Sequence, residues 1–367
     1  MTENTPPTLK LRVLSIDGGG TRGMIPATIL ENLERETGKS VLDLFDVFIG
    51  TSTGGIIVAA LAAGIRPSEL IELYTDRSNK IFEPMFFRSF FSLVRARYTN
   101  DNLRSELEKK LGKMTFGDVH RKYNVAGEAP KKVFLITSFD LAPTERRLYY
   151  DAVRNKEEIT EEPVNFRPAI FNSCFQRDEN LSLLDAALRT SAGPGFLPIV
   201  EKYTDGGVAL NHPAMAAISF CLNKGYASIT DGKSRRYDSP RKGLQAEIED
   251  LKVLSLGTGT SNTAYLRELD IESGDKGELF WASHISNLLI ESSMAATEYY
   301  IRQILQPGKQ YMRLQLYFNS PDAPPEIRGR NIQLDESRGV ILGGLRKYAQ
   351  DFYTKNKQAI LAFVTQD

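Results

Sequence analysis

A serine framed by glycines is the strongest candidate for a catalytic group. Residues 50–54 read Gly-Thr-Ser-Thr-Gly, which places Ser52 at the centre of a GxSxG pattern. In this pattern a strand turns sharply into a helix, and Gly50 and Gly54 stand where side chains would clash. The serine hydroxyl is then exposed, and the next amide, from Thr53, faces the oxyanion that forms when an ester carbonyl is attacked. The pattern predicts acyl transfer at Ser52, with an ordinary Ser/Thr/Gly turn as the alternative.

A serine nucleophile needs a base, and histidine is the usual one. The chain has three histidines, His120, His212 and His284. His120 lies in polar sequence, which is typical of the surface, and His212 precedes Pro213 where a helix is expected to begin. His284 lies in a long helical pattern that favours a packed or capping role. None lies in a loop beside an acidic residue, so the sequence does not single out a histidine base.

Asp205 is the better candidate for the base. It is followed by Gly206 and Gly207 and lies between Tyr203 and the apolar Val208. Two glycines after a carboxylate indicate a tight loop that another part of the chain approaches closely. Alone, the motif is as often a simple Asp-Gly turn. Together with the GxSxG pattern, it predicts a carboxylate that acts on the serine.

Residues 17–23, Asp-Gly-Gly-Gly-Thr-Arg-Gly, allow three interpretations. The glycine spacing matches the GxGxxG dinucleotide fingerprint, but Asp17 would repel a pyrophosphate and no acidic residue ends the second strand. The run also resembles the first phosphate loop of actin-fold sugar kinases and ATPases, with residues 256–260 as the second loop. That fold continues into an antiparallel hairpin, whereas here a helix is expected at once.

The third interpretation is an oxyanion hole. Consecutive glycines between a strand and a helix gather backbone N–H groups into a concave surface beside the positive helix N-terminus. The amides of Gly18, Gly19 and Gly20 would then stabilise an oxyanion, each donor being worth about 3–4 kcal/mol in well-studied cases. Arg22 adds positive charge nearby. The glycine run alone does not decide among the three interpretations.

The elements around these motifs predict a parallel α/β sheet. A buried strand, Leu11–Ile16, precedes the glycine run and a helix, Met24–Thr37, follows it. The strand Phe45–Ile49 and the helix Ile56–Ala63 flank the GxSxG pattern in the same way. Strand, glycine turn and helix in succession are typical of parallel sheets covered by helices. Further strands are expected at Lys132–Ser138, Lys252–Leu256 and Tyr311–Leu316, and helices at Leu183–Ser191, Pro213–Asn223, Leu279–Leu305 and Gly343–Phe363.

The composition excludes several classes of protein. Lys plus Arg and Asp plus Glu both number 46 in 367 residues, so no global charge favours a nucleic acid polymer. The N-terminus has no apolar signal-peptide region, and no run of about 18 apolar residues predicts a membrane-spanning helix. Cys174 and Cys221 show no CxxC spacing and are expected to be reduced core thiols. We therefore expect a cytoplasmic protein that reaches lipid, if at all, from the membrane surface.

Taken in order, residues 17–23, 50–55 and 205–207 resemble the patatin-like phospholipase family. Weaker similarities are Thr190-Ser191-Ala192 and residues 253–259, and the resemblance covers about residues 10–320. It implies a single large three-layer α/β domain with a mainly parallel sheet and a nucleophile-elbow serine hydrolase site. The implied activity is a phospholipase A type of lipid acyl hydrolysis without a metal or other cofactor.

In that family a serine and an aspartate form a dyad without histidine. Carried over, Ser52 is the nucleophile and Asp205 the base, and the backbone of Gly18, Gly19, Gly20 and Thr53 forms the oxyanion hole. The other motif residues then support this arrangement: Arg22, Gly23, Gly50, Gly54, Gly206 and Gly207.

The chain departs from the family pattern at two places near the expected acyl-binding region. Asn211-His212-Pro213 stands where the family usually has two asparagines before the proline. Residues 193–196, Gly-Pro-Gly-Phe, stand where the family often has Pro-Thr-Tyr. Neither departure touches the dyad, but both leave the substrate preference open.

For the domain organisation we expect a disordered tail (1–9), the hydrolase domain (10–320) and a C-terminal extension (321–367) that ends in a closing helix. Residues 226–250, rich in Lys, Arg, Asp and Ser, are expected to form a surface insertion. Phe82–Phe91 lies in the most aromatic stretch. It indicates either a peripheral membrane contact or a buried amphipathic helix.

Two rival functions remain at this stage. A sugar kinase or ATPase would bind nucleotide and depend on Mg²⁺. A regulated phospholipase effector, such as one activated by a cyclic nucleotide in antiphage defence, is compatible with the length of the chain, although no sequence feature identifies a nucleotide site. A non-catalytic module of the same fold is disfavoured because both Ser52 and Asp205 are present.

Overall fold

The structure is a computed structural model of the chain. It describes residues 10–76, 96–151, 156–163, 165–223, 228–230, 233–235, 243–260, 274–275 and 277–366. The predicted tail at 1–9, the Phe82–Phe91 segment and much of the predicted insertion at 226–250 lie outside the described residues. The membrane role of Phe82–Phe91 and the domain boundaries stay predictions.

Seven strands form the central sheet in the order β11-β10-β1-β2-β3-β6, with β7 also paired to β3. Five of them run parallel, namely β1 (Leu11–Ile16), β2 (Val47–Gly50), β3 (Val133–Asp140), β10 (Leu251–Leu256) and β11 (Tyr311–Leu314). The other two, β6 (Arg167–Asn172) and β7 (Tyr203–Asp205), run antiparallel to β3. The predicted mainly parallel α/β sheet is confirmed.

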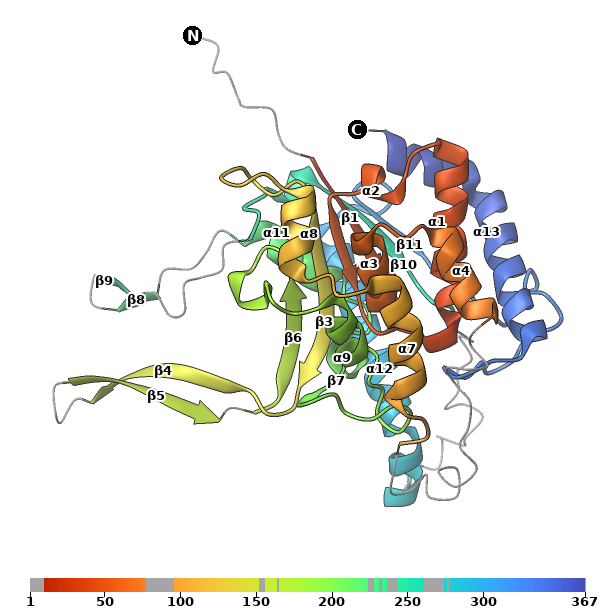
Figure 1. The fold of residues 1–367 in the computed structure, drawn as a ribbon. Helices are drawn as coiled ribbons and strands as arrows, with labels where there is room; N and C mark the ends of the chain where they lie inside the picture. Colours follow the sequence, from red (N-terminus) through yellow and green to blue (C-terminus); the bar gives the residue numbers. More distant parts are fainter. Residues whose placement is uncertain are drawn as a thin grey trace, which may run out of the picture.

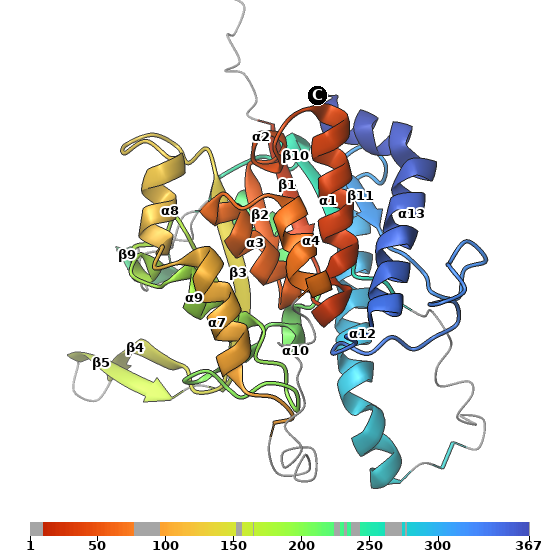
Figure 2. The same cartoon turned by 45° about the vertical axis from the view of Figure 1, so that its right-hand side comes forward.

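Helices cover both faces of the sheet, which explains why the central strands are buried throughout. One face carries α1 (Met24–Thr37), α3 (Thr53–Ala63), α4 (Pro67–Asp76), α7 (Asn100–Leu111), α9 (Leu183–Thr190) and α13 (Gly339–Thr365), several of which lie side by side in Figure 2. The opposite face carries α11 (Ala214–Leu222) and α12 (Glu278–Ile304). The result is three layers with one hydrophobic core on each face of the sheet (Figure 1).

The described chain has further elements. They are α2 (Val41–Leu44), α8 (Phe116–Tyr123), α10 (Gly207–Leu210), a hairpin of β4 (Thr144–Asp151) and β5 (Lys156–Pro163), and a pair of β8 (Ser228–Thr230) and β9 (Lys233–Arg235). Among the residues described, no helix is long and apolar enough to cross a membrane.

Most predicted elements are present, with shifts of a few residues at their ends. The strand expected at Phe45–Ile49 begins instead at Val47. The predictions missed α4, α7 and α8 and the strands β4, β5, β6 and β7. The twelve residues of α7 are mostly polar. Helix α7 buries only one stripe, Leu103, Leu107 and Leu111 among its apolar residues, so its pattern is weak in the sequence.

The pairing along β3 determines where β7 lies. Strand β6 pairs with β3 from Leu135 to Asp140 and occupies one edge of it. On the other edge, β2 pairs with Val133–Ile136 and β7 with Ser138–Asp140. Strand β7 therefore takes over the edge of β3 at the point where β2 ends.

The C-terminal part of the chain joins the same core. Helix α13 packs against α1, and its buried residues, such as Leu345 and Tyr353, belong to the larger hydrophobic cluster. Before α13, the carbonyl of Leu334 accepts a hydrogen bond from the amide of Thr21 at 2.9 Å. The extension thus reaches the loop that follows β1.

Candidate active site

Ser52 occupies a strained turn between β2 and α3. Its backbone has φ 53° and ψ −122°, a left-handed φ that is uncommon for a residue with a side chain. A Cβ at Gly50 would lie 2.1 Å from the carbonyl oxygen of Gly54, and one at Gly54 would lie 2.2 Å from that of Ile16. Both contacts are far below van der Waals distance, so the turn requires glycine at both positions, as the GxSxG pattern predicts.

Neighbouring hydroxyls hold this turn in place. The Ser52 amide donates to Oγ1 of Thr190 at 2.8 Å, and the Thr51 hydroxyl donates to the carbonyl of Leu210 at 2.5 Å. Oγ1 of Thr51 also lies 2.6 Å from Oγ1 of Thr137 on β3. These bonds tie the turn to α9, α10 and the sheet, which is how the surrounding structure maintains the strained conformation.

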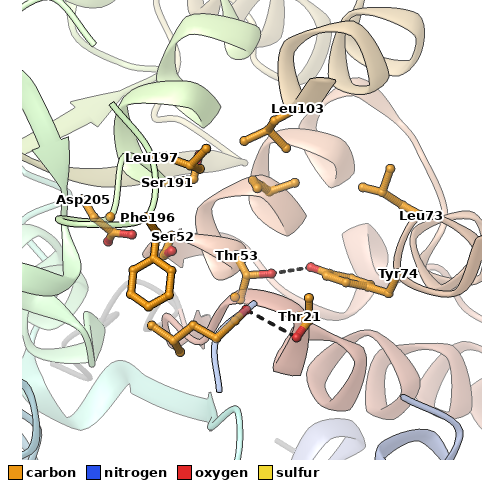
Figure 3. Close-up of a pocket in the computed structure, with 14 residues that line it drawn as sticks. Thr21, Ser52, Thr53, Leu73, Tyr74, Leu103, Ser191, Phe196, Leu197 and Asp205 are labelled. Atoms are coloured by element: carbon orange, nitrogen blue, oxygen red, sulfur yellow. Dashed lines mark hydrogen bonds between the residues drawn. The ribbon is translucent and has the colours of Figure 1, made fainter. Parts of the chain in front are cut away.

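Asp205 ends β7 and lies beside Ser52. The two side chains point toward one another on the wall of a pocket in Figure 3. The Asp205 carboxylate accepts a hydrogen bond from the Gly207 amide at 2.7 Å. Burial raises the pKa of Asp205 to about 6, while the hydrogen bond from the Gly207 amide and the nearby Ser52 hydroxyl act in the opposite direction.

The glycine run after β1 lies directly against the serine. A Cβ at Gly18 would lie 3.3 Å from Cβ of Ser52. The amides of Gly19, Gly20 and Thr53 find no acceptor among the residues that the structure describes, so they are available to an oxyanion. The Gly18 amide differs from the expectation: it donates to the carbonyl of Asn211 at 3.1 Å, because the loop packs closely against that residue.

Arg22 and Gly23 shape this loop. The Arg22 guanidinium donates to the carbonyls of Gly19 at 3.3 Å and Gly259 at 3.2 Å. A Cβ at Gly23 would lie 2.2 Å from Oγ1 of Thr53, so the glycine permits the close approach of α3. Gly206 is similarly confined, since a Cβ there would lie 2.3 Å from Oγ1 of Thr137.

An ion pair that the sequence did not reveal anchors the start of the glycine run. Nη1 of Arg313 on β11 lies 3.0 Å from Oδ1 of Asp17, and Nη2 lies 2.5 Å from Oδ2. Asp17 is completely buried. Burial raises the pKa of Asp17, and the charge and hydrogen bonds of Arg313 oppose that rise. The two residues are 296 positions apart, and no local pattern links them.

The described histidine side chains make their hydrogen bonds to residues other than Ser52 and Asp205. His212 is buried, with Nε2 3.0 Å from Oγ of Ser255 and 3.4 Å from the hydroxyl of Tyr311. Burial, followed by the charge of Arg313, lowers the pKa of His212 well below its usual value, so its ring is neutral. His120 lies on α8, with Nδ1 3.3 Å from the side-chain amide of Asn124. His284 belongs to α12, but its side chain lies outside the description.

An apolar pocket opens onto Ser52 and Asp205. Its wall includes Gly193 and Phe196, from one of the two stretches that depart from the family pattern. Tyr74, another wall residue, hydrogen-bonds to the Thr53 hydroxyl (Figure 3). The remaining apolar wall is formed by Ile56, Leu73, Leu103, Leu197 and Leu334. A fatty acyl chain matches such a lining.

The described residues contain no group of three or more His, Cys, Asp or Glu side chains placed to hold a metal ion. The dyad, the free amides and the apolar pocket together suit attack on an acyl carbonyl. A strained serine above the end of a parallel strand, with a carboxylate beside it, is the arrangement of an α/β acyl hydrolase.

Comparisons with known proteins identify the family. The patatin-like phospholipase model matches residues 14–218. A Solanum tuberosum protein named probable inactive patatin-3-Kuras 1 is 30% identical over 339 residues, covering 83% of this chain and 78% of that protein. Patatin-like protein 2 of Oryza sativa subsp. indica is 32% identical over 355 residues, covering 86% and 78%. A Vibrio cholerae protein named cGAMP-activated phospholipase is 26% identical over 367 residues, covering 95% and 93%.

The chain therefore belongs to the patatin-like phospholipase family. The interpretations of the glycine run as a dinucleotide fingerprint or as an actin-fold phosphate loop were wrong, because neither belongs to this fold. Family membership makes the chain one of the lipid acyl hydrolases as a class.

Proposed function

We propose that this protein releases fatty acids from phospholipids, with Ser52 as nucleophile and Asp205 as base. One observation carries the proposal: Ser52 and Asp205 both line an apolar pocket, with their side chains pointing toward one another. One relative is named a probable inactive patatin, so the assignment of turnover rests on this geometry as well as on the family.

The proposed reaction proceeds through an acyl-enzyme. Oγ of Ser52 attacks the ester carbonyl carbon while Asp205 accepts the hydroxyl proton. The tetrahedral oxyanion accepts hydrogen bonds from the amides of Gly19, Gly20 and Thr53. Collapse breaks the ester bond, and the lysolipid leaves with the proton from Asp205. Water then attacks the acyl-serine and gives a proton to Asp205. Collapse breaks the bond between the acyl carbon and Oγ of Ser52, the proton passes from Asp205 to Oγ, and the fatty acid leaves.

The environment of Asp205 supports its role as a base. An ordinary aspartate is a weak base because its pKa, about 3.9, is far below the operating pH. Burial raises the pKa of Asp205 to about 6, which brings the carboxylate closer to the range in which a general base is effective. Proton transfer concerted with attack avoids a free alkoxide at Ser52.

The test compares Ser52→Ala with the unmodified protein on mixed phospholipids, with mass spectrometry for released fatty acid and lysolipid. We expect the substitution to abolish release while the melting temperature is preserved. Ser219→Ala is a matched control, since Ser219 is an exposed residue of α11 whose hydroxyl bonds to the carbonyl of Met215. Release by a folded Ser52→Ala protein at the unmodified rate would refute the assignment.

A second candidate concerns regulation. Relatives from Vibrio cholerae and Escherichia coli are named cGAMP-activated phospholipases, and the former aligns along 95% of this chain. We propose on that basis that a cyclic nucleotide activates this protein. The check is fatty acid release with and without cGAMP; equal rates at saturating nucleotide would contradict activation by cGAMP.

A further inference from the structure

Exposed apolar side chains gather at the end of the molecule where the candidate active site lies. We call this set the apolar rim, and define it as Leu141, Phe166, Ile199, Val208, Trp281, Ile285 and Leu289. Phe166 is 65% exposed, Ile199 56% and Leu289 55%. Single exposed apolar side chains are ordinary, but several at one end of a molecule are unusual for a surface that faces only water.

Four members of the rim surround the strand that carries Asp205. Leu141 directly follows β3, and its amide donates to the carbonyl of Lys202 at 2.9 Å. Ile199 precedes β7, and Val208 follows it on α10. Phe166 precedes β6, with its ring centroid 5.7 Å from that of Phe139 at the end of β3. Leu141, Phe166 and Ile199 therefore lie at the carboxyl end of the parallel strands, and Val208 lies on α10, which packs against α12.

The other three members follow one face of α12. Trp281, Ile285 and Leu289 are spaced by four residues, so they lie one above another along the helix. The amino-terminal part of α12 extends beyond the carboxyl ends of the parallel strands in Figures 1 and 2. Residues 279–290 contain no Asp, Glu, Lys or Arg.

Helix α12 is connected to the candidate active site. The side-chain amide of Asn211 donates to Sδ of Met294 on α12 at 3.0 Å. The carbonyl of Asn211 accepts the Gly18 hydrogen bond at the start of the glycine run. The rim residues on α12 and those around β7 thus flank one site from two sides.

We propose that the apolar rim is the surface through which this protein docks on a phospholipid bilayer. The proposal rests on the proposed function: a phospholipid with two acyl chains resides in a bilayer, so the face that carries the pocket must meet lipid. An apolar face with a tryptophan at its outer end suits the boundary between headgroups and acyl chains.

Two cations near the rim are already paired, which favours apolar insertion over electrostatic attraction. Lys202 pairs with Asp140 at 2.8 Å and Arg189 with Glu201 at 2.9 Å, so these cations are already neutralised. The net charge of the whole chain is zero at pH 7. Docking through the rim should therefore occur on neutral lipid and persist in high salt, because salt screens charge but not apolar burial.

The first experiment uses the unmodified chain, because Trp281 is its only tryptophan and reports directly on the rim. Phosphatidylcholine vesicles should shift Trp281 emission to shorter wavelength, and brominated phosphatidylcholine should quench it, in both low and high salt. An emission spectrum unchanged by vesicles would overturn the proposal. A blue shift that instead grows with protein concentration in the absence of lipid would assign the rim to contact with a second copy of the chain.

The second experiment changes the rim without touching the dyad. We expect Ile285→Ser with Leu289→Ser to weaken vesicle binding at least about tenfold, since two apolar side chains no longer enter the membrane. Hydrolysis of a short water-soluble ester should stay within about twofold of the unmodified rate. Val125→Ser is the matched control, because Val125 is 52% exposed in the loop before β3, at the opposite end of that strand.

The outcomes separate this inference from the proposed function. Loss of vesicle binding with retained soluble-ester hydrolysis supports the rim, whereas unchanged vesicle binding in the double variant refutes it. If the unmodified protein binds vesicles through Trp281 but hydrolyses neither substrate, the proposed function fails and the docking surface stands. If the double variant does not fold, the response of Trp281 emission to vesicles in the unmodified chain decides whether the rim contacts lipid.

Discussion

Asp205 occupies, beside Ser138 of β3, the position that Ser52 would have had if β2 had continued. Gly50, the last residue of β2, pairs with Ile136, and Asp205 pairs with Ser138 two residues further along the same edge. The chain leaves the sheet after Gly50 in the strained turn. Strand β7 then pairs with the part of the β3 edge that β2 does not cover. Because β2 and β7 share one edge of β3, Asp205 lies beside Ser52 although the two residues are 153 positions apart in the sequence.

The pH dependence of hydrolysis should follow the ionisation of Asp205. Only the carboxylate accepts the Ser52 proton, and burial raises its pKa to about 6. The rate on a soluble ester should therefore rise as pH increases through about 6 and level off above about 7. A pH–rate profile of kcat/KM measures this. A half-maximal rate near pH 4 would mean that the base is not a buried carboxylate.

Asp205→Asn should abolish most activity and yet stabilise the fold at neutral pH. Because the folded-state pKa is raised, the unfolded chain ionises first as pH rises from about 4 to 6, and stability falls over that range. Asparagine escapes this penalty, which is about 3 kcal/mol for a rise from 3.8 to about 6. Urea unfolding at pH 7.5 and pH 4 measures the effect. The free energy of unfolding of Asp205→Asn should exceed that of the unmodified protein at pH 7.5, and the difference should be small at pH 4.

Substitutions of the histidines should leave hydrolysis largely intact. Nε2 of His212 is engaged with Ser255 and Tyr311, and His120 lies on α8 beside Asn124. His120→Ala, His212→Gln and His284→Ala should each retain more than about a tenth of the activity, the equivalent of one lost interaction of about 1.4 kcal/mol. Turnover measured with a melting curve on the same sample is the check. A collapse confined to a well-folded His212 variant would replace the dyad with a triad.

Arg313→Gln should destabilise the protein strongly. Removing the guanidinium leaves Asp17 charged and buried without its partner, which costs about 3–5 kcal/mol in comparable cases. The double variant Asp17→Asn with Arg313→Gln should recover part of that loss, since no lone charge remains. Denaturant unfolding of the three proteins measures the coupling. Equal destabilisation of the single and double variants would show that the loss of stability does not come from the unpaired charge of Asp17.

Chelation should have no effect on hydrolysis. The proposed steps use the Ser52 hydroxyl, the Asp205 carboxylate and backbone amides, and none of them calls for a metal ion. Turnover of a soluble ester should be the same before and after dialysis against EDTA. Loss of activity that calcium or magnesium restores would point to a metal-dependent reaction instead.

The sequence alone predicted the two turns and the chemistry expected of them. The glycines at positions 50 and 54 predict the turn, because a turn of this kind leaves no room for side chains at these positions. Continuous apolar runs predict the strand and the helix that flank it. The same local logic identified the loop at Asp205-Gly206-Gly207. The order of these motifs was enough to suggest the family.

The tertiary structure determined which distant residues contact these motifs. Only the edge-sharing of β2 and β7 along β3 places Asp205 at Ser52, and only packing raises the carboxyl pKa. The engagement of the Gly18 amide by Asn211 and the pairing of Asp17 with Arg313 join distant parts of the chain. Such contacts leave no periodic trace in the sequence, because a hydrogen bond or an ion pair depends on distance in space, whereas turn and strand signals depend on neighbours along the chain.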